Sequence, residues 1–277
     1  MEIITSLFTS PELAFLRLAL LFGLAASPAL GVVGTLVVTR RISSLAGASA
    51  HAALGGMGIA LYMARVWQMH CVTPLLGAAA GAVTAALVVG LVSLYGKERE
   101  DTVIGVVWAA GMSIGLLFLD RTPGYVDWQG YLFGNILLLS PGDLKLMALL
   151  DVLVVIPAVI WRQEILALSF DPVFAKLRGV KTDLIYMLIL AVTALTIVLL
   201  INLAGIILVI ALLTLPAAIA GIFSRHLYSM MIFAGILAAV FVISGLAASF
   251  VFALPSGPVI VVEAAFVYIA ALLLRRK

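Results

Sequence analysis

The stretch LIYMLILAVTALTIVLLINLAGIILVIALLTLPAAIAGIF (184–223) holds no charged residue, and its nearest charges are Asp183 and Arg225. A helix that crosses a membrane needs roughly 20 apolar residues, so this stretch is long enough for two such helices. In lipid, only helices and closed barrels satisfy all of their backbone hydrogen bonds. Because the apolar residues are continuous rather than alternating with polar ones, a barrel is excluded and the stretch predicts membrane-spanning helices.

The rest of the chain has the same character. Of its 277 residues, 65% are hydrophobic and only 10% are charged, whereas about a quarter of the residues of a soluble domain are charged. We therefore predict an all-α, polytopic integral membrane bundle that forms a single domain over 1–277. The expected spans are 12–38, 42–65, 73–95, 102–119, 143–161, 184–202, 204–223, 229–252 and 257–274. One weak or re-entrant segment would reduce these nine spans to eight.

The positive charges predict how the chain is oriented, because Lys and Arg gather on the cytoplasmic side of membrane proteins. With the N-terminus outside and the C-terminus inside, the nine-span arrangement places most of the 16 Lys and Arg residues inside. A miscounted span would destroy that bias. Orientation also accounts for the net charge of +3, so we expect no nucleic-acid partner. The chain should be a multi-pass protein of a bacterial plasma (inner) membrane.

His51 is the first candidate functional residue, because it is an ionisable side chain inside a predicted span. It lies about 13 Å into the span that begins near Ile42, at 1.5 Å per residue, close to the middle of a core roughly 30 Å thick. Small residues share its helix face: Ser44, Gly47, Gly55 and Gly58. They permit close helix packing or leave open volume beside the imidazole. Neutral imidazole binds zinc, copper and iron, so the alternatives are a metal pathway and a hydrogen bond to a facing helix.

Three carboxylates are further candidates for the metal pathway. Glu263 and Asp151 lie within apolar spans, where an ionisable group costs several kcal/mol and therefore has a partner or a function. A metal or proton role and a hydrogen bond to a neighbouring helix explain either residue equally well. Asp101 stands at the start of a span, where a carboxylate caps free N–H groups, and capping is favoured there over metal binding.

The segment 162–183, expected inside, contains FDPVFAKLRGV (170–180). This stretch predicts a short amphipathic helix that ends at Gly179, with Phe174 and Leu177 on one face. It would lie outside the bilayer and be available to a cytoplasmic partner.

The segment 120–142, expected outside, carries Tyr125, Trp128 and Tyr131, aromatic residues typical of the lipid headgroup region. The chain contains no phosphate-binding glycine loop and no soluble catalytic domain. It is therefore not expected to be an enzyme, and any ATP hydrolysis would take place on another chain.

Four parts of the chain, in order, resemble a known family. They are SSLAGASAHAALGG (43–56) after Arg40 and Arg41, YLFGN (131–135) after Asp127, FDPVFAKLRGV (170–180), and LAGIILVIALLTLPAAIA (203–220) with PSGP (255–258). The chain resembles the permease family of zinc, manganese and iron ABC importers, and looks most like the zinc-uptake members. The similarity covers nearly the whole chain.

That resemblance implies a homodimer of permeases in membrane lipid, two cytoplasmic ABC ATPase subunits and an external metal-binding protein. No cofactor would be tightly bound. The transported ion would be Zn²⁺, or alternatively Mn²⁺ or Fe²⁺, with ATP held by the partner ATPase. The coupling residues for that ATPase would be Asp171, Phe174, Ala175 and Gly179, and His51 would be the pathway histidine.

One departure from the family pattern concerns the metal. Many relatives carry an aspartate four residues before the histidine, where this chain has Gly47. Manganese prefers oxygen ligands, whereas zinc tolerates sites rich in nitrogen. The missing carboxylate therefore favours zinc and leaves the other ligands open.

Other classes of transporter remain as alternatives. A proton-coupled secondary metal transporter would use Asp151 and Glu263 as proton sites and would need no ATPase, but it leaves the amphipathic segment 170–180 unexplained. ABC permeases for siderophores or vitamins would ordinarily be longer. A membrane enzyme is least consistent with the sequence, because no cluster of catalytic side chains falls at one membrane depth.

Overall fold

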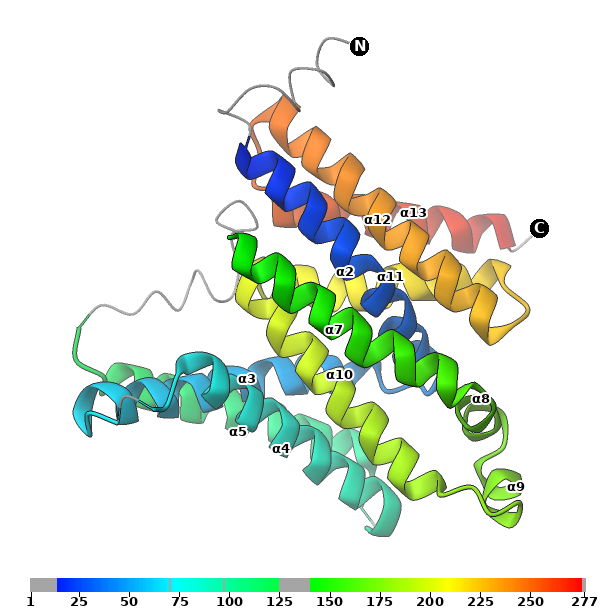
Figure 1. Cartoon of the computed structure of the whole chain (residues 1–277), viewed down its shortest axis with the longest axis horizontal. Coiled ribbons are helices and arrows are strands. Elements are labelled where there is room, and N and C mark those ends of the chain that lie inside the picture. Colours follow the sequence, from blue (N-terminus) through cyan, green and yellow to red (C-terminus); the bar gives the residue numbers. More distant parts are fainter. Residues whose placement is uncertain (1–13, 70, 97, 125–139, 276–277) are drawn as a thin grey trace. The chain divides into compact units, whose positions relative to one another are not determined.

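A computed structural model describes residues 14–69, 71–96, 98–124 and 140–275. Every regular element in these ranges is a helix (Figure 1). The helices are α2 (Ala14–Thr39), α3 (Ser43–Val66), α4 (Pro74–Tyr95), α5 (Glu100–Asp120), α7 (Pro141–Ile160), α8 (Arg162–Phe170), α9 (Pro172–Leu177), α10 (Thr182–Ala204), α11 (Ile206–Phe223), α12 (Leu227–Phe252) and α13 (Ser256–Arg275).

Among the described residues, 8 helices are long and apolar enough to cross a membrane, or up to 9 if α7 and α8 together count as one span. The prediction of an all-α, polytopic bundle with eight or nine spans is confirmed. The uncharged stretch 184–223 divides at Gly205, which has a φ of +80° and separates α10 from α11. The predicted YLFGN motif (131–135) and the aromatic residues Tyr125, Trp128 and Tyr131 lie outside the described residues.

The chain forms two compact units, which we describe separately. One unit comprises Met1–Val38, Gln129–Ile160 and Leu199–Lys277, and the other comprises Thr39–Trp128 and Trp161–Val198. The first contains most of α2 together with α7 and α11 to α13. The second contains α3, α4, α5, α8, α9 and most of α10.

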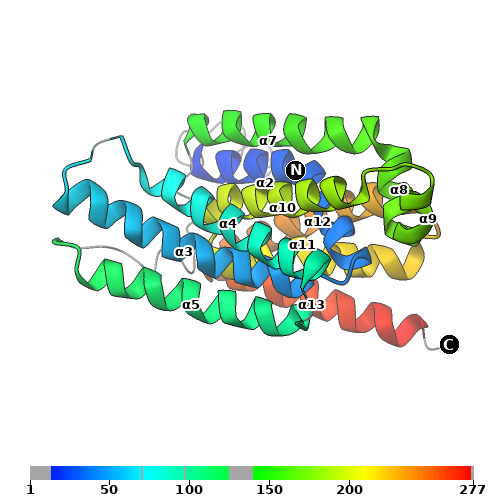
Figure 2. The ribbon, with the colours of Figure 1, turned by 90° about the horizontal axis from the view of Figure 1, so that it is seen from below.

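In the second unit, α3 lies between α4 and α5 (Figure 2). Glycine allows these helices to touch through their backbones. A Cβ atom on Gly55 would lie 2.7 Å from the Gly111 carbonyl oxygen, and one on Gly58 would lie 2.6 Å from that of Gly115. The residue numbers increase in both helices from the first pair to the second, so α3 and α5 run parallel. The small residues beside His51 therefore serve close helix packing, one of the two uses the sequence suggested.

In the first unit, α11, α12 and α13 pack against one another and α12 runs along α2. A Cβ atom on Gly31 of α2 would lie 2.7 Å from the backbone nitrogen of Gly235 in α12. A small core forms where α11 meets α12, from Ala217, Ala220, Met230 and Ala234. Such small residues at helix contacts are what membrane bundles use to bring backbones close.

Candidate functional site

The imidazole of His51 stacks on the indole of Trp108, which projects from α5. The ring centroids are 5.0 Å apart and the planes differ by 23°. His51 is half-buried, and its Nδ1 atom is buried with no hydrogen-bond partner among the described residues. The imidazole is therefore held by an aromatic contact rather than by a hydrogen bond at Nδ1. A nitrogen with an unused lone pair or proton is what a metal ligand needs to have available.

Gly47 lies one helical turn before His51 and faces the same indole. A Cβ atom at position 47 would lie 2.6 Å from both Cη2 and Cζ3 of Trp108, closer than packed carbon atoms can approach. The space that the sequence left open beside His51 is therefore filled by the six-membered ring of Trp108.

The predicted cap at Asp101 is wrong. Helix α5 begins at Glu100, two residues before the predicted start, with Arg99 in the cap position and no side-chain cap bond, so that Asp101 lies exposed in the first turn. Its charge there complements the helix dipole. The neighbouring Glu100 makes the specific contacts, because its carboxylate accepts hydrogen bonds from the Tyr186 hydroxyl at 3.1 Å and the Ser93 hydroxyl at 3.3 Å.

Asp151 accepts a hydrogen bond from helix α2, next to a proline that lies inside that helix. Pro28 has no N–H and its ring disturbs the preceding turn of α2. The Leu24 carbonyl, which Pro28 cannot bond, accepts from the Ser27 hydroxyl at 2.8 Å. The Asp151 Oδ1 atom accepts from the Ala29 backbone N–H at 3.0 Å. Asp151 thus makes the hydrogen bond to a neighbouring helix that was one of its two interpretations.

Glu263 is half-buried on α13, and no hydrogen bond or ion pair within the described residues involves it. It belongs to the same unit as Asp151, whereas His51 and Asp101 belong to the other. Across the described residues, no three His, Cys, Asp or Glu side chains gather as a metal site. The structure therefore pairs His51 with Trp108, and the four predicted pathway residues are divided between the two units.

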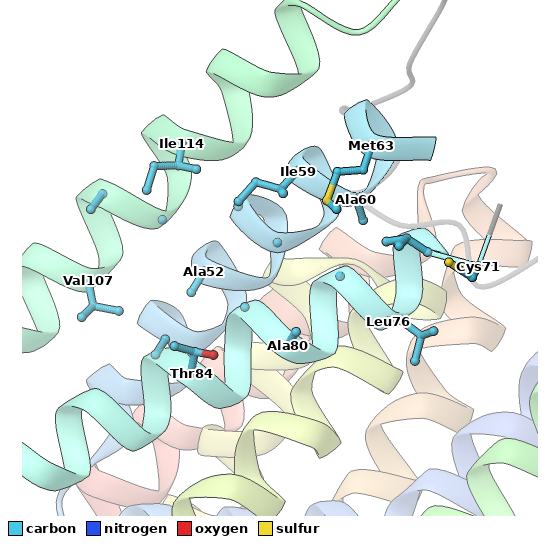
Figure 3. A pocket seen from close by; sticks show the side chains of 18 residues that line it. Ala52, Ile59, Ala60, Met63, Cys71, Leu76, Ala80, Thr84, Val107 and Ile114 are labelled. Carbon is cyan, nitrogen blue, oxygen red and sulfur yellow. The ribbon is translucent and has the colours of Figure 1, made fainter. Parts of the chain in front are cut away.

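An apolar groove runs over α3 between α4 and α5, with a volume of about 660 Å³ (Figure 3). Ala52 and Ile59 of α3 line its middle, Leu76 and Ala80 line it from α4, and Ile114 lines it from α5. Its lining includes the thiol of Cys71 and the hydroxyl of Thr84 but no charged side chain and no imidazole. A divalent ion would find no adequate ligand set there, so the groove is suited to apolar chains or to another helix.

The predicted amphipathic helix is present as α9, directly after α8 (Figure 1). Asp171 caps it, accepting from the Phe174 N–H at 2.9 Å. At its other end Gly179 has a φ of +82°, its N–H bonds the Lys176 carbonyl, and the Val180 N–H bonds the Ala175 carbonyl. This pair of bonds is the Schellman motif, which needs a residue that accepts a left-handed conformation.

One side of α9 is apolar and exposed. Leu177 is 82% exposed and Phe174 is 51% exposed, and Phe170 and Val173 are exposed beside them, whereas Ala175 is 1% exposed and anchors the helix. The Arg178 guanidinium lies 5.0 Å from the Phe174 ring centroid. Exposed apolar residues bordered by charge, outside the expected spans, mark an interaction surface.

Behind α9, a polar cluster connects several helices of the same unit. The Arg40 guanidinium donates to the Leu168 carbonyl of α8 at 2.7 Å and lies 5.1 Å from the Tyr186 ring centroid. Tyr186 of α10 in turn donates to Glu100 of α5. Lys176 of α9 pairs with Asp183 at 3.0 Å. The cluster therefore links the α8–α9 segment to the start of α5, the helix that carries Trp108.

A family model described as the ABC 3 transport family matches residues 12–275. The chain belongs to the ABC 3 transport family. This confirms, at the level of the family, the resemblance found in the sequence.

Relatives of this ABC 3 family member have similar lengths. An uncharacterized membrane protein of Synechocystis is 42% identical over 95% of this chain and 91% of its own. A probable metal transport system membrane protein of Chlamydia trachomatis is 37% identical, with coverage of 100% and 93%. The manganese transport system membrane protein MntC of Listeria monocytogenes is 30% identical, with coverage of 96% and 92%.

Among solved structures, PsaBC from Streptococcus pneumoniae in complex with Fab matches with a TM-score of 0.83 over 98% of this chain and 94% of the other. The sequences are 24% identical. The likeness shows that this ABC 3 family member shares that fold.

Two features of this ABC 3 family member were not anticipated from its sequence. Trp108 is one of four tryptophans in a span that otherwise looks lipid-facing, and nothing local indicates its contact with His51. Glu100 stands beside Asp101, and only the positions of Tyr186 on α10 and Ser93 on α4 decide which carboxylate is bonded. The position of a residue within a helix can be predicted from its neighbours in the sequence. In contrast, His51 and Tyr186, the partners of Trp108 and Glu100, come from distant parts of the chain.

Proposed function

We propose that this chain is the membrane-spanning permease subunit of an ATP-driven importer for a divalent metal ion, with zinc as the ion. The observation that carries the metal role is His51, an imidazole in the middle of a predicted span whose Nδ1 atom has no hydrogen-bond partner among the described residues. The family membership supports import by an ABC system. The name of the Chlamydia trachomatis relative supports a metal as the substrate.

Zinc is favoured over manganese by the ligands available to His51. Position 47 carries no side chain and the Trp108 ring fills the space beside it, so position 47 supplies no carboxylate. Zinc accepts sites rich in nitrogen, whereas manganese prefers oxygen. Manganese is the second candidate, and the name of the Listeria monocytogenes relative favours it.

Transport requires partners, which we propose on chemical grounds. The exposed apolar side of α9 would dock on a cytoplasmic ABC ATPase, since this chain has no phosphate-binding loop. A homodimer would provide a His51 side chain from each copy along one pathway, and an external metal-binding protein would deliver the ion. With the N-terminus outside and the C-terminus inside a bacterial plasma membrane, α9 lies on the ATPase side.

The mechanism we propose is alternating access. ATP binding would close the ATPases and displace α9. The polar cluster of Arg40, Tyr186 and Glu100 would pass that displacement to α5 and so to the stack of Trp108 on His51. The imidazoles would bind Zn²⁺ only transiently, because an ion held with the 10–16 kcal/mol typical of structural zinc sites would not leave.

Uptake into proteoliposomes tests this function. The liposomes would contain this chain with its co-purified ATPase and binding protein, and would be loaded with ATP. Zinc entry that needs ATP and survives a proton uncoupler supports the proposal, and competition by manganese or iron then ranks the ions. Uptake without an ATPase that stops with the uncoupler would instead indicate the secondary transporter. In that case Asp151 and Glu263 would be examined as proton sites.

A further inference from the structure

We propose that Trp108 determines metal specificity, because its indole occupies the position from which a second ligand would join His51. This inference rests on the proposed function and extends it to a residue whose role the sequence did not suggest.

The argument starts from the spacing of Gly47 and His51. Residues four apart on a helix are neighbours, with Cβ atoms about 5–6 Å apart, so a side chain at position 47 would reach an ion bound to His51. Gly47 offers no such side chain. The place is not vacant either, because Cη2 and Cζ3 of Trp108 would be 2.6 Å from a Cβ atom there.

The same indole also orients the imidazole. The two rings are stacked at 5.0 Å, so the indole covers one face of the imidazole, whose Nδ1 atom is itself buried. Trp108 therefore has two effects: it holds the imidazole and it excludes a neighbouring carboxylate. Both favour an ion that accepts nitrogen over one that requires several oxygens.

The arrangement predicts that Gly47 and Trp108 depend on each other. A side chain at position 47 requires the outer edge of the Trp108 indole to shift, whereas it has room once the indole is removed. The informative variant is thus the double substitution Gly47→Asp with Trp108→Ala, compared with each single substitution. Gly105→Asp, on α5 where a Cβ atom would meet nothing within 4 Å, is the matched control for adding a carboxylate to this unit.

The measurement is the ratio of manganese to zinc uptake in the reconstituted complex, with expression and assembly recorded for every variant. We expect Trp108→Ala alone to lower zinc uptake while the ratio stays close to wild type. The double variant should move the ratio toward manganese by about tenfold, equivalent to 1.4 kcal/mol. Gly105→Asp should leave the ratio unchanged.

Two results would overturn the inference. One is a shift in the ratio for Gly47→Asp alone as large as for the double variant, because the indole would then exclude nothing. The other is an unchanged ratio in a double variant that assembles normally.

Metal binding is measured separately from transport, so that failure of the proposed function stays distinguishable. Manganese should raise the unfolding temperature of the purified double variant more than that of Trp108→Ala, since binding to the folded state stabilises it. A wild-type complex that moves no divalent metal would refute the proposed function. Equal manganese stabilisation of the two variants would refute the inference about Trp108.

Discussion

Replacing Gly179 by alanine should disrupt the end of α9 and weaken docking of the partner ATPase. Gly179 has a φ of +82° and nothing lies within 4 Å of the position where a Cβ atom would be placed. The substitution therefore introduces no clash, and its cost is backbone strain alone. For an L-residue in the left-handed region that cost is about 1–2 kcal/mol.

The strain has a defined structural consequence. The left-handed residue allows the Gly179 and Val180 N–H groups to bond the Lys176 and Ala175 carbonyls. If these bonds break, the last turn of a helix only 6 residues long is lost, together with the placement of Leu177. A cost of one or two kcal/mol changes the population of the intact end by a factor of roughly 5–30. Affinity for an ATPase that requires this end should fall by up to the same factor.

Two assays check this expectation. Hydrogen exchange of the Val180 amide reports the bond to Ala175 directly, and co-purification of the ATPase reports docking. Gly179→Asn is the matched variant, since asparagine accepts the left-handed conformation far better than alanine does. We expect faster exchange and weaker co-purification for Gly179→Ala and near wild-type behaviour for Gly179→Asn.

The reasoning would be refuted by Gly179→Ala retaining slow exchange at Val180, because the turn would then tolerate the substitution. If the Val180 amide of Gly179→Ala exchanged rapidly while the ATPase still bound fully, the turn would depend on Gly179 as argued, but α9 would not be the docking element.

Three further outcomes are expected. His51→Ala should abolish ATP-dependent zinc uptake at normal expression, and uptake at the wild-type rate would exclude a pathway role. Phe174→Asp should prevent assembly with the ATPase, because it places a charge in the exposed apolar side of α9; an intact complex on gel filtration would contradict this. Tyr186→Phe, which removes the hydrogen bond to Glu100, should destabilise the protein by about 1 kcal/mol and lower zinc transported per ATP; an unchanged transport ratio would show that the cluster is only structural.

The spans and the ends of α9 were predictable because their signals are local. Hydrophobic length defines a membrane helix, and Gly179 predicted the end of α9 from its position directly after the amphipathic stretch. Asp171, which caps the start of α9, is a signal of the same local kind that was not used. The same local signals gave the wrong start for α5, which begins two residues earlier than predicted, so that Asp101 lies in the first turn rather than at the cap. Helix boundaries are uncertain at this level from sequence alone.

The partners of the candidate residues were not predictable, since they depend on contacts between distant segments. Asp151 bonds Ala29 from a position 122 residues away. Trp108 reaches His51 across the α3–α5 contact, which exists because glycines let the two backbones meet. A single sequence shows which residue types are present, but it does not show which of them are in contact, and their roles depend on those contacts.

Hydrogen bonding distinguishes the candidates that the sequence treated alike. In lipid, a polar group without a partner costs several kcal/mol, so those with structural roles are expected to be bonded. Asp151 is bonded to α2, and the hydroxyls of Thr196 and Thr214 donate to carbonyls one turn earlier in their own helices. The Nδ1 atom of His51 is buried without such a partner among the described residues. A buried polar group without a partner calls for an explanation. For His51 the proposed contact with a transported ion supplies one, whereas the hydrogen bond to α2 already accounts for Asp151.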